Sequence, residues 1–313
     1  MRLNRLRALQ PNACWRRGNP RLHCTQSVKK FHTPKLRAES KHVAHKRQLL
    51  ALACSCLFCA AQLHAVPPAP PPQTPVGELH AAQLMAAALS ARSASPEEMQ
   101  KMERIFADLD AKYPHDVSIK NGHAEFLWSI GEHNRAAKLW QEAEKLDPNN
   151  GAVLHHLGGN ALTIGDVNKA ADYYARAVQS APNNAGYHFS YANVVFLFRH
   201  DLHDDAHPES DWRIEEALKH FAEASRLEPM NAEYARGFAE TYYSSPQPDW
   251  HEALRAWQHL YDISAQKDFA LLNLARVHLK LGNKPEARAA LAQVQDPKYA
   301  RLKGRLSERI ETE

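Results

Sequence analysis

The side chains best suited to bind a metal ion gather in one short stretch of this 313-residue chain. Residues 200–211 read His-Asp-Leu-His-Asp-Asp-Ala-His-Pro-Glu-Ser-Asp, which is three histidines and five carboxylates. Imidazole and carboxylate ligands together suit Zn²⁺ or a similar divalent ion. His200, His203 and His207 are therefore candidate metal ligands. The alternative, which we favour, is a solvated polar loop whose charges oppose aggregation.

Motifs of catalysis are missing from the rest of the sequence. It contains no nucleotide-binding glycine loop, nucleophile elbow, His-Glu-x-x-His pair or calcium-binding loop. All five cysteines lie at positions 14 to 59, so residues 60–313 offer no thiolate and suit an oxidising compartment. We expect a protein that is not an enzyme and that carries no cofactor.

A 34-residue period organises the chain around these residues. Pro114, Pro148 and Pro182 are 34 residues apart, and residues 117–150 and 151–184 both end in Pro-Asn-Asn. Equivalent positions within the two units carry equivalent residue types, namely a small residue, a glycine, an alanine, a large ring and an alanine. The pairs are Ala124 and Gly158, Gly131 and Gly165, Ala136 and Ala170, Trp140 and Tyr174, and Ala143 and Ala177.

These positions predict pairs of packed helices. Small residues allow two helices to approach closely, and the large ring fills the space between successive pairs. Glycine permits a positive φ where the first helix ends. Proline ends the second helix, because it has no N–H to donate and restricts the residue before it. Each unit should therefore be a helical hairpin that stacks on the next.

The pattern continues on both sides of the two regular units. A third unit is interrupted, because Pro229 follows Pro182 by 47 residues, so the run 200–212 is an insertion between its two helices. A fourth and a fifth unit follow. Upstream, Ser95 should cap the second helix of a divergent first unit. At the C-terminus, Leu302, Leu306 and Ile310 share one helical face, which predicts a capping helix.

These positions resemble the tetratricopeptide repeat family over about residues 80–297. The resemblance implies an all-α, right-handed superhelical solenoid of helix-turn-helix hairpins with a C-terminal capping helix. We assign residues 78–297 to the solenoid and 298–313 to the capping helix.

The same resemblance implies a concave groove lined by the first helix of each hairpin, and a scaffold that binds a protein or peptide there. A clamp for chain termini is not expected, because Asn121 and Glu125 stand where it needs lysine and asparagine. The groove residues carried over are Asn121, Glu125, Trp128, His155, Phe189, Asn193, Phe196, Arg236, Glu240, Tyr243, Leu272 and Arg276. Two alternative functions stay open: metal binding or sensing by residues 200–211, and self-assembly as a homo-oligomer with the groove filled by the protein's own N-terminal segment.

The N-terminal segment differs in charge from the remainder. Residues 1–47 hold 13 Lys/Arg and one acid, for a net charge of +12, whereas residues 48–313 hold 26 Lys/Arg and 34 acids, for a net charge of −8. The basic character of the chain is thus confined to a leader over residues 1–47. A nucleic-acid partner is not expected for the acidic repeat domain.

An export signal is the expected role of the next segment, residues 48–65. Lys46 and Arg47 precede a 13-residue apolar run, which fits a signal-peptide core and is too short to span a membrane. Cleavage after Ala65 would free a Pro-rich linker, residues 66–77. We expect an exported protein, periplasmic or secreted, that acts in cell-envelope assembly or secretion, with translation starting near Val43. The alternatives are a membrane anchor at residues 49–65 and, less favoured, a mitochondrial targeting segment.

Overall fold

The protein is described by a computed structural model over residues 75–90, 94–202 and 211–312. The expected leader, signal segment and most of the Pro-rich linker lie outside these residues. Within them no helix is long and apolar enough to cross a membrane.

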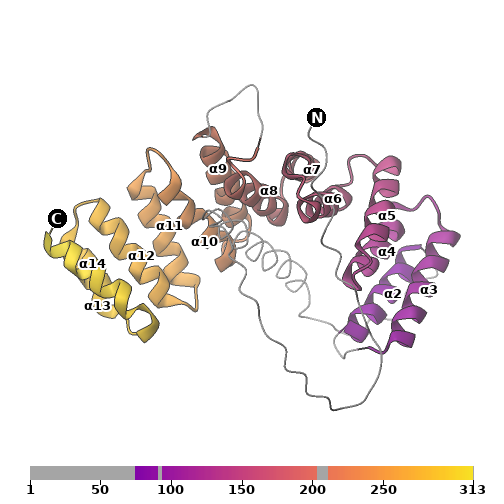
Figure 1. The fold of residues 1–313 in the computed structure, drawn as a ribbon, viewed down its shortest axis with the longest axis horizontal. Coiled ribbons are helices and arrows are strands. Elements are labelled where there is room, and N and C mark those ends of the chain that lie inside the picture. Colours follow the sequence, from indigo (N-terminus) through magenta and orange to yellow (C-terminus); the bar gives the residue numbers. More distant parts are fainter. Residues whose placement is uncertain (1–74, 91–93, 203–210, 313) are drawn as a thin grey trace, which may run out of the picture. The chain divides into compact units, whose positions relative to one another are not determined.

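The described residues form α-helices and two short 3₁₀-helices, with no strand among them, so the all-α prediction is confirmed (Figure 1). The elements in chain order are α2 (Pro75–Ser90), α3 (Pro96–Lys112), α4 (Val117–Ser129), α5 (His133–Leu146), α6 (Gly151–Ile164), α7 (Val167–Ser180), α8 (Ala185–Leu197), α9 (Asp211–Leu227), α10 (Ala232–Thr241), η1 (Tyr242–Ser244), α11 (Trp250–Ile263), α12 (Lys267–Lys280), α13 (Lys284–Gln293), η2 (Pro297–Tyr299) and α14 (Ala300–Thr312).

Consecutive helices pack as hairpins, and the hairpins stack. The pairs α4 with α5, α6 with α7, α8 with α9, α10 with α11 and α12 with α13 are the five expected units. The divergent first unit also exists, as α2 packed on α3. Each hairpin contacts the next one along the chain, and α14 closes the series by packing against α12 and α13. The fold is a solenoid of helical hairpins with a terminal helix.

The glycine and Pro-Asn-Asn signals act at the helix ends as expected. Gly131, Gly165 and Gly282 all follow first helices and have φ of 86°, 86° and 78°, a left-handed conformation that favours glycine. The last asparagine of each Pro-Asn-Asn begins the next hairpin. The Asn150 side chain accepts a hydrogen bond from the Val153 N–H at the start of α6, and Asn184 caps α8 in the same way.

The N-terminal boundary of the repeats differs from the expectation. The linker was expected to run to residue 77, but α2 already begins at Pro75, where proline suits the first turn of a helix. Leu79 is only 7% exposed and belongs to the core shared with α3. The capping box of α3 is confirmed, because Glu98 N–H donates to Ser95 Oγ and Ser95 N–H donates to Glu98 Oε2.

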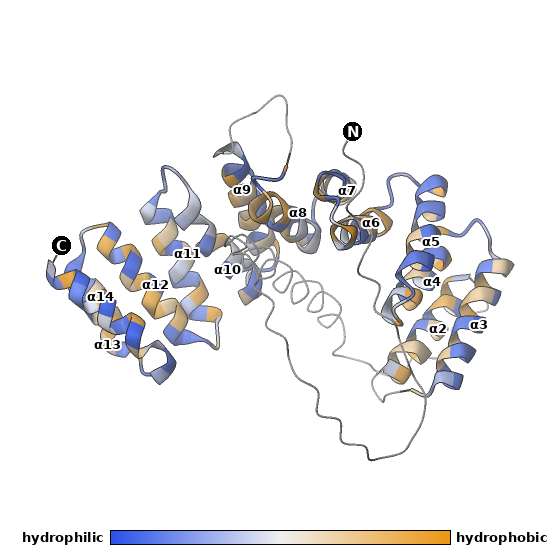
Figure 2. Ribbon diagram, in the orientation of Figure 1, coloured by the Kyte–Doolittle hydropathy of each residue, from blue (hydrophilic) through white to orange (hydrophobic). Residues whose placement is uncertain are grey.

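The small and large residues of the repeat register are buried, but the Tyr174 ring packs against Gly158 within one hairpin, whereas it was expected to fill the space between successive hairpins. Ala136 and Ala170 are fully buried, and the Trp140 and Tyr174 rings are almost completely buried. A Cβ added to Gly158 would lie 2.8 Å from the Tyr174 ring, so glycine is what allows α7 to approach α6. Figure 2 shows apolar and polar residues on each of these helices, as stacked amphipathic hairpins require.

The buried residues form four separate clusters along the chain rather than one common core. Neighbouring clusters are joined by half-buried side chains that pack against both. In chain order, the clusters are formed mainly by α2–α4, by α4–α7, by α8–α10 and by α10–α14. Ile130 contacts the first and second clusters, Tyr191 the second and third, and Phe238 the third and fourth. We call these three residues the bridging residues.

A chain of hydrogen bonds holds α8 to α9 across the insertion. His188 Nε2–H donates to the Pro182 carbonyl, and His188 Nδ1 lies 2.8 Å from His220 Nδ1. His220 Nε2 lies 3.0 Å from Glu216 Oε1. Because a carbonyl and a carboxylate only accept, the Nε2–H of each ring is the donor in the contacts with Pro182 and Glu216. The Arg213 guanidinium adds a hydrogen bond to the Leu202 carbonyl.

Candidate functional site

The predicted groove residues lie on the first helices of the five hairpins, α4, α6, α8, α10 and α12, except Tyr243, which lies in η1 directly after α10. Side chains of successive first helices contact one another, so these helices present one connected surface, which we call the groove face. It consists of the predicted groove residues that retain solvent exposure, together with the side chains in direct contact with them.

At the N-terminal end of the groove face, Asn121 and Glu125 belong to a polar network. The Trp140 indole N–H donates to Asn121 Oδ1 over 3.0 Å, and the Asn121 amide donates to Glu125 Oε1 over 2.8 Å. His156 Nε2 lies 2.9 Å from the same carboxylate oxygen, and its ring stacks on Trp140. These contacts fix Glu125 in place. Trp128 stays half-buried beside Trp140, 5.5 Å away between ring centroids.

His155 belongs to α6 and contacts side chains of both α7 and α8. Its Nε2 is 2.9 Å from Ser190 Oγ, and its ring lies 5.2 Å from the Tyr187 ring and 5.3 Å from the Tyr174 ring. Burial, with a smaller contribution from His156, lowers the pKa of His155 to about 3. The ring is therefore neutral near pH 7 and serves as a flat, uncharged lining of the groove face.

The two phenylalanines of α8 have different environments. Phe189 is 5% exposed and packs against Phe221 and Tyr234, so it belongs to the core instead of the groove face. Phe196 is half-buried, with the Arg199 guanidinium 5.3 Å above its ring. Asn193 lies between them and donates to the Phe189 carbonyl. Of the two rings, Phe196 is the one that a partner can reach.

At the C-terminal end, cations lie over aromatic rings. The Arg276 guanidinium lies 4.2 Å from the Tyr243 ring centroid and donates to Asn273 Oδ1 over 2.9 Å. Arg236 lies 4.6 Å from the Phe269 ring and forms an ion pair with Glu240. Leu272, by contrast, is 1% exposed and is part of the core.

Several residues of this face were missed by the sequence-based assignment, although a signal existed for two of them. Phe269 and Lys280 occupy the second and thirteenth positions of the fifth unit, which face the groove in the resembled family. The sequence-based assignment took groove residues only from positions five, nine and twelve of each unit. Tyr187 and Ser190 had no such signal, because their role depends on a contact with His155 across two hairpins.

The candidate metal ligands are only partly described. His200 is exposed at the end of α8, whereas His203 and His207 lie outside the described residues. Within the described ranges, no three His, Cys, Asp or Glu side chains come together in a way that could hold a metal ion. The metal site stays a prediction. A calorimetric titration with Zn²⁺, compared with a variant lacking the three histidines, would test it.

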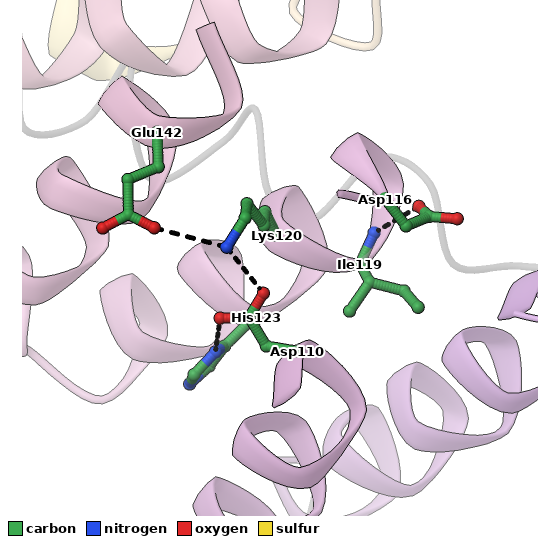
Figure 3. Close-up of polar contacts among 6 residues, drawn as sticks. All are labelled: Asp110, Asp116, Ile119, Lys120, His123 and Glu142. Carbon is green, nitrogen blue, oxygen red and sulfur yellow. Dashed lines mark hydrogen bonds and ion pairs between the residues drawn. The ribbon is translucent and has the colours of Figure 1, made fainter. Parts of the chain in front are cut away.

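A second polar cluster lies between α3, α4 and α5, and Figure 3 shows its contacts. The buried Lys120 ammonium forms ion pairs with Asp110 at 2.9 Å and with Glu142 at 3.3 Å. His123 lies 3.9 Å from Asp110, but neither of its buried ring nitrogens makes a hydrogen bond. Burial lowers the pKa of His123. The Lys120 ion pairs therefore tie α4 to α3 of the preceding hairpin and to α5 of its own hairpin.

Surface hollows do not coincide with the groove face. A hollow of about 460 Å³ lies between the second helices α5 and α7, and another of about 600 Å³ lies along α3. None of the predicted groove residues lines either of them. Small-molecule sites are usually enclosed and mostly apolar. Both hollows are open to solvent, so neither is assigned as a small-molecule site.

Comparisons with known proteins agree with this geometry. The sequence model of the tetratricopeptide repeat family matches residues 269–296, which cover α13 and most of α12. No curated protein matches the sequence.

Two solved structures share the fold. The structure of YrrB, described as "a TPR protein with an unusual peptide-binding site", matches with a TM-score of 0.53 and 16% identity over 65% of this chain and 97% of that chain. The structure of pilF from Pseudomonas aeruginosa matches with a TM-score of 0.54 and 14% identity over 76% of this chain and 99% of that chain. Together with the repeat register and the observed hairpins, these matches define the class by its fold: a solenoid of helical hairpins like those of tetratricopeptide repeat structures, with a family match at residues 269–296.

Proposed function

We propose that this protein is a non-catalytic scaffold that binds a peptide or a protein segment along its groove face. The observation that carries the proposal is the placement of aromatic rings. Trp128 of α4, Phe196 of α8 and Tyr243 of η1 stay half-buried, whereas Trp140 and Trp257 of the second helices are buried almost completely. Large rings that keep exposed surface on one connected face are typical anchors of protein interfaces.

The expected ligand is an extended or helical segment of another protein. The groove face offers rings separated by polar groups such as Asn193, which suits a chain that inserts side chains at intervals. YrrB, which shares the fold, is described as having a peptide-binding site. The likeness supports a ligand of the same chemical kind here.

A photo-crosslinking amino acid placed in the full chain would test the scaffold role. At Trp128 and at Phe196 it should capture a partner in cells. At Lys138 and Lys169, which are exposed on the second helices, it should not. Equal capture from both pairs of positions would contradict a groove-specific interface, and so would a lack of capture from all four.

We also propose that the scaffold works in the cell envelope. The support is in the sequence: a net charge of +12 over residues 1–47, a 13-residue apolar run after Lys46 and Arg47, and a repeat domain without cysteine. Fractionation of cells followed by N-terminal sequencing would test this. A mature chain that begins near Val66 in the envelope fraction is expected. A cytoplasmic chain that retains residues 1–65 would contradict export.

A further inference from the structure

Three cations of the C-terminal half of the groove face lie over aromatic rings, and together they form what we call the cationic subsite: Arg236, Arg276 and Lys280. Arg276 lies over Tyr243 at 4.2 Å, Arg236 over Phe269 at 4.6 Å and Lys280 over Trp250 at 5.8 Å. The cations come from the first helices α10 and α12. Because α10 and α12 begin successive hairpins, the three charges belong to one stretch of the groove face.

The central cation of this subsite is held in position before any ligand arrives. Arg276 donates to the side chain of Asn273, which is only 5% exposed. The Asn273 amide is itself fixed by donating to the Phe269 carbonyl, and the Asn273 carbonyl accepts from the Tyr243 hydroxyl over 3.2 Å. Tyr243 is thus tied to the same residue that orients Arg276. A guanidinium that is already oriented loses little conformational entropy when it binds an anion.

The charges of the subsite are not balanced within the protein. Arg236 pairs with Glu240 and also lies near Glu233. Neither Arg276 nor Lys280 forms an ion pair in the part of the chain that the structure describes. Other cations of the described residues also lack an ion pair, and what distinguishes Arg276 and Lys280 is their place over the Tyr243 and Trp250 rings. The missing negative charge is available to a ligand.

Resting on the proposed scaffold function, we propose that the cationic subsite binds an acidic peptide segment, with side-chain carboxylates on Arg276 and Lys280 and apolar side chains against the adjoining rings. Arg276 and Lys280 are four residues apart on α12, about 6 Å along the helix axis. Alternate side chains of an extended peptide lie about 6.5 Å apart on one face. The spacing therefore fits acidic residues at every second position of the bound segment.

The half-buried rings favour a peptide over a nucleic acid, the other common polyanion. A cation already lies over the Phe269 ring and over the Tyr243 ring, so a base, which stacks flat on a ring face, fits less well there than an apolar side chain packed against the ring edges. The net charge of −8 over residues 48–313 also opposes the approach of a long polyanion. A short acidic segment places its charges only on the cationic subsite and avoids this repulsion.

Fluorescence anisotropy with the full chain would test the proposal, using a labelled peptide in which glutamates alternate with leucines. The matched peptide has glutamine in place of glutamate, and a single-stranded oligothymidylate of equal charge is the nucleic-acid probe. We expect the glutamate peptide to bind about tenfold more tightly than the glutamine peptide. Raising the salt concentration from about 50 to about 300 mM should weaken it, because the contacts are at the surface.

Variants of the same net charge separate a local site from a general charge effect. The pair Arg276→Gln and Lys280→Gln should weaken the glutamate peptide about tenfold. The pair Lys101→Gln and Lys138→Gln, on the second helices α3 and α5, should change it less than about twofold. Circular dichroism confirms that each variant is folded.

The possible results are decisive and separable. Equal binding of both peptides, or equal effects of both pairs of substitutions, would overturn the cationic subsite. Tighter binding of the oligothymidylate would replace the acidic peptide by a nucleic acid. If the glutamine peptide binds as well as the glutamate peptide and Phe196→Ala abolishes both, the scaffold stands without the subsite. If crosslinking shows no partner on the groove face and neither peptide binds, the scaffold function itself fails.

Discussion

Mild acid should destabilise this protein, and His155 provides a quantitative test. Burial against Tyr174 and Tyr187 lowers the pKa of the His155 imidazole from its ordinary value of 6.5 to about 3. The folded protein therefore keeps this ring neutral at pH 5, whereas the unfolded chain binds a proton there. Stability that depends on the neutral ring is complete above pH 6.5 and is lost as the pH falls from 6.5 toward 3.

The magnitude follows from the two pKa values. Each pH unit below the unfolded-state pKa costs about 1.4 kcal/mol while the folded-state ring stays neutral. At pH 5, which is 1.5 units below the ordinary pKa of 6.5, the loss from His155 alone is about 2 kcal/mol. Because pH 5 lies well above the folded-state pKa of about 3, nearly the whole loss comes from protonation of His155 in the unfolded chain.

Urea unfolding at pH 7.5 and at pH 5 would measure this loss, with His155→Gln as the control. Glutamine still offers an acceptor to the Ser190 hydroxyl but does not titrate. Other buried histidines, such as His123 and His188, also have lowered pKa values and act in both proteins. The wild type should therefore lose about 2 kcal/mol more than the variant between the two pH values. Equal losses would refute the reasoning, because the ring would then take up its proton in the folded state.

Three further predictions concern binding and packing. Phe196→Ala should weaken partner binding by ~1–3 kcal/mol and leave the helicity unchanged. Ala170→Arg should instead reduce the helicity, because overpacking a tight helix crossing costs ~1–3 kcal/mol or more. Binding and circular dichroism, measured on both variants, distinguish the two effects. His123→Phe should raise the free energy of unfolding in urea by about 1 kcal/mol, because two buried nitrogens without hydrogen bonds are removed; a lower free energy of unfolding would contradict this. Trp140→Phe should cost about 1 kcal/mol more than Trp257→Phe in the same assay, since only the Trp140 indole N–H has an acceptor; equal costs would argue against it.

The hairpin architecture could be predicted from the sequence because its determinants are local. A glycine with positive φ, a proline that ends a helix and an asparagine that caps the next one act within a few residues of one another. Gly165, Pro148 and Asn150 therefore specify helix ends before any tertiary contact is known. The start of α2 was less certain, because its alanine-rich sequence lacks a clear apolar face.

The groove face could be predicted only in part, because exposure depends on neighbours distant in sequence. Phe189 occupies a position that faces the groove in the resembled family, yet Phe221 and Tyr234 cover it. Gly237 makes this possible, since a Cβ there would lie 2.8 Å from the Phe221 ring and 3.3 Å from the Phe189 ring. The repeat pattern indicates which face of its helix a residue occupies, but not the size of the side chains that pack against it from other helices. The ring contacts of Arg236 and Arg276 likewise join different hairpins.

The three bridging residues determine how far a disturbance in one part of the chain travels. Each core cluster can melt without its neighbour once the side chain shared between them is lost, because stability in a stacked array is a sum of repeat and interface terms. Truncating Tyr191 or Phe238 would thus alter cooperativity more than the strength of any single core. Unfolding would split into separate steps, visible as unequal hydrogen exchange along the chain. A ligand that stiffened one hairpin would therefore also stiffen the hairpins beside it through these side chains.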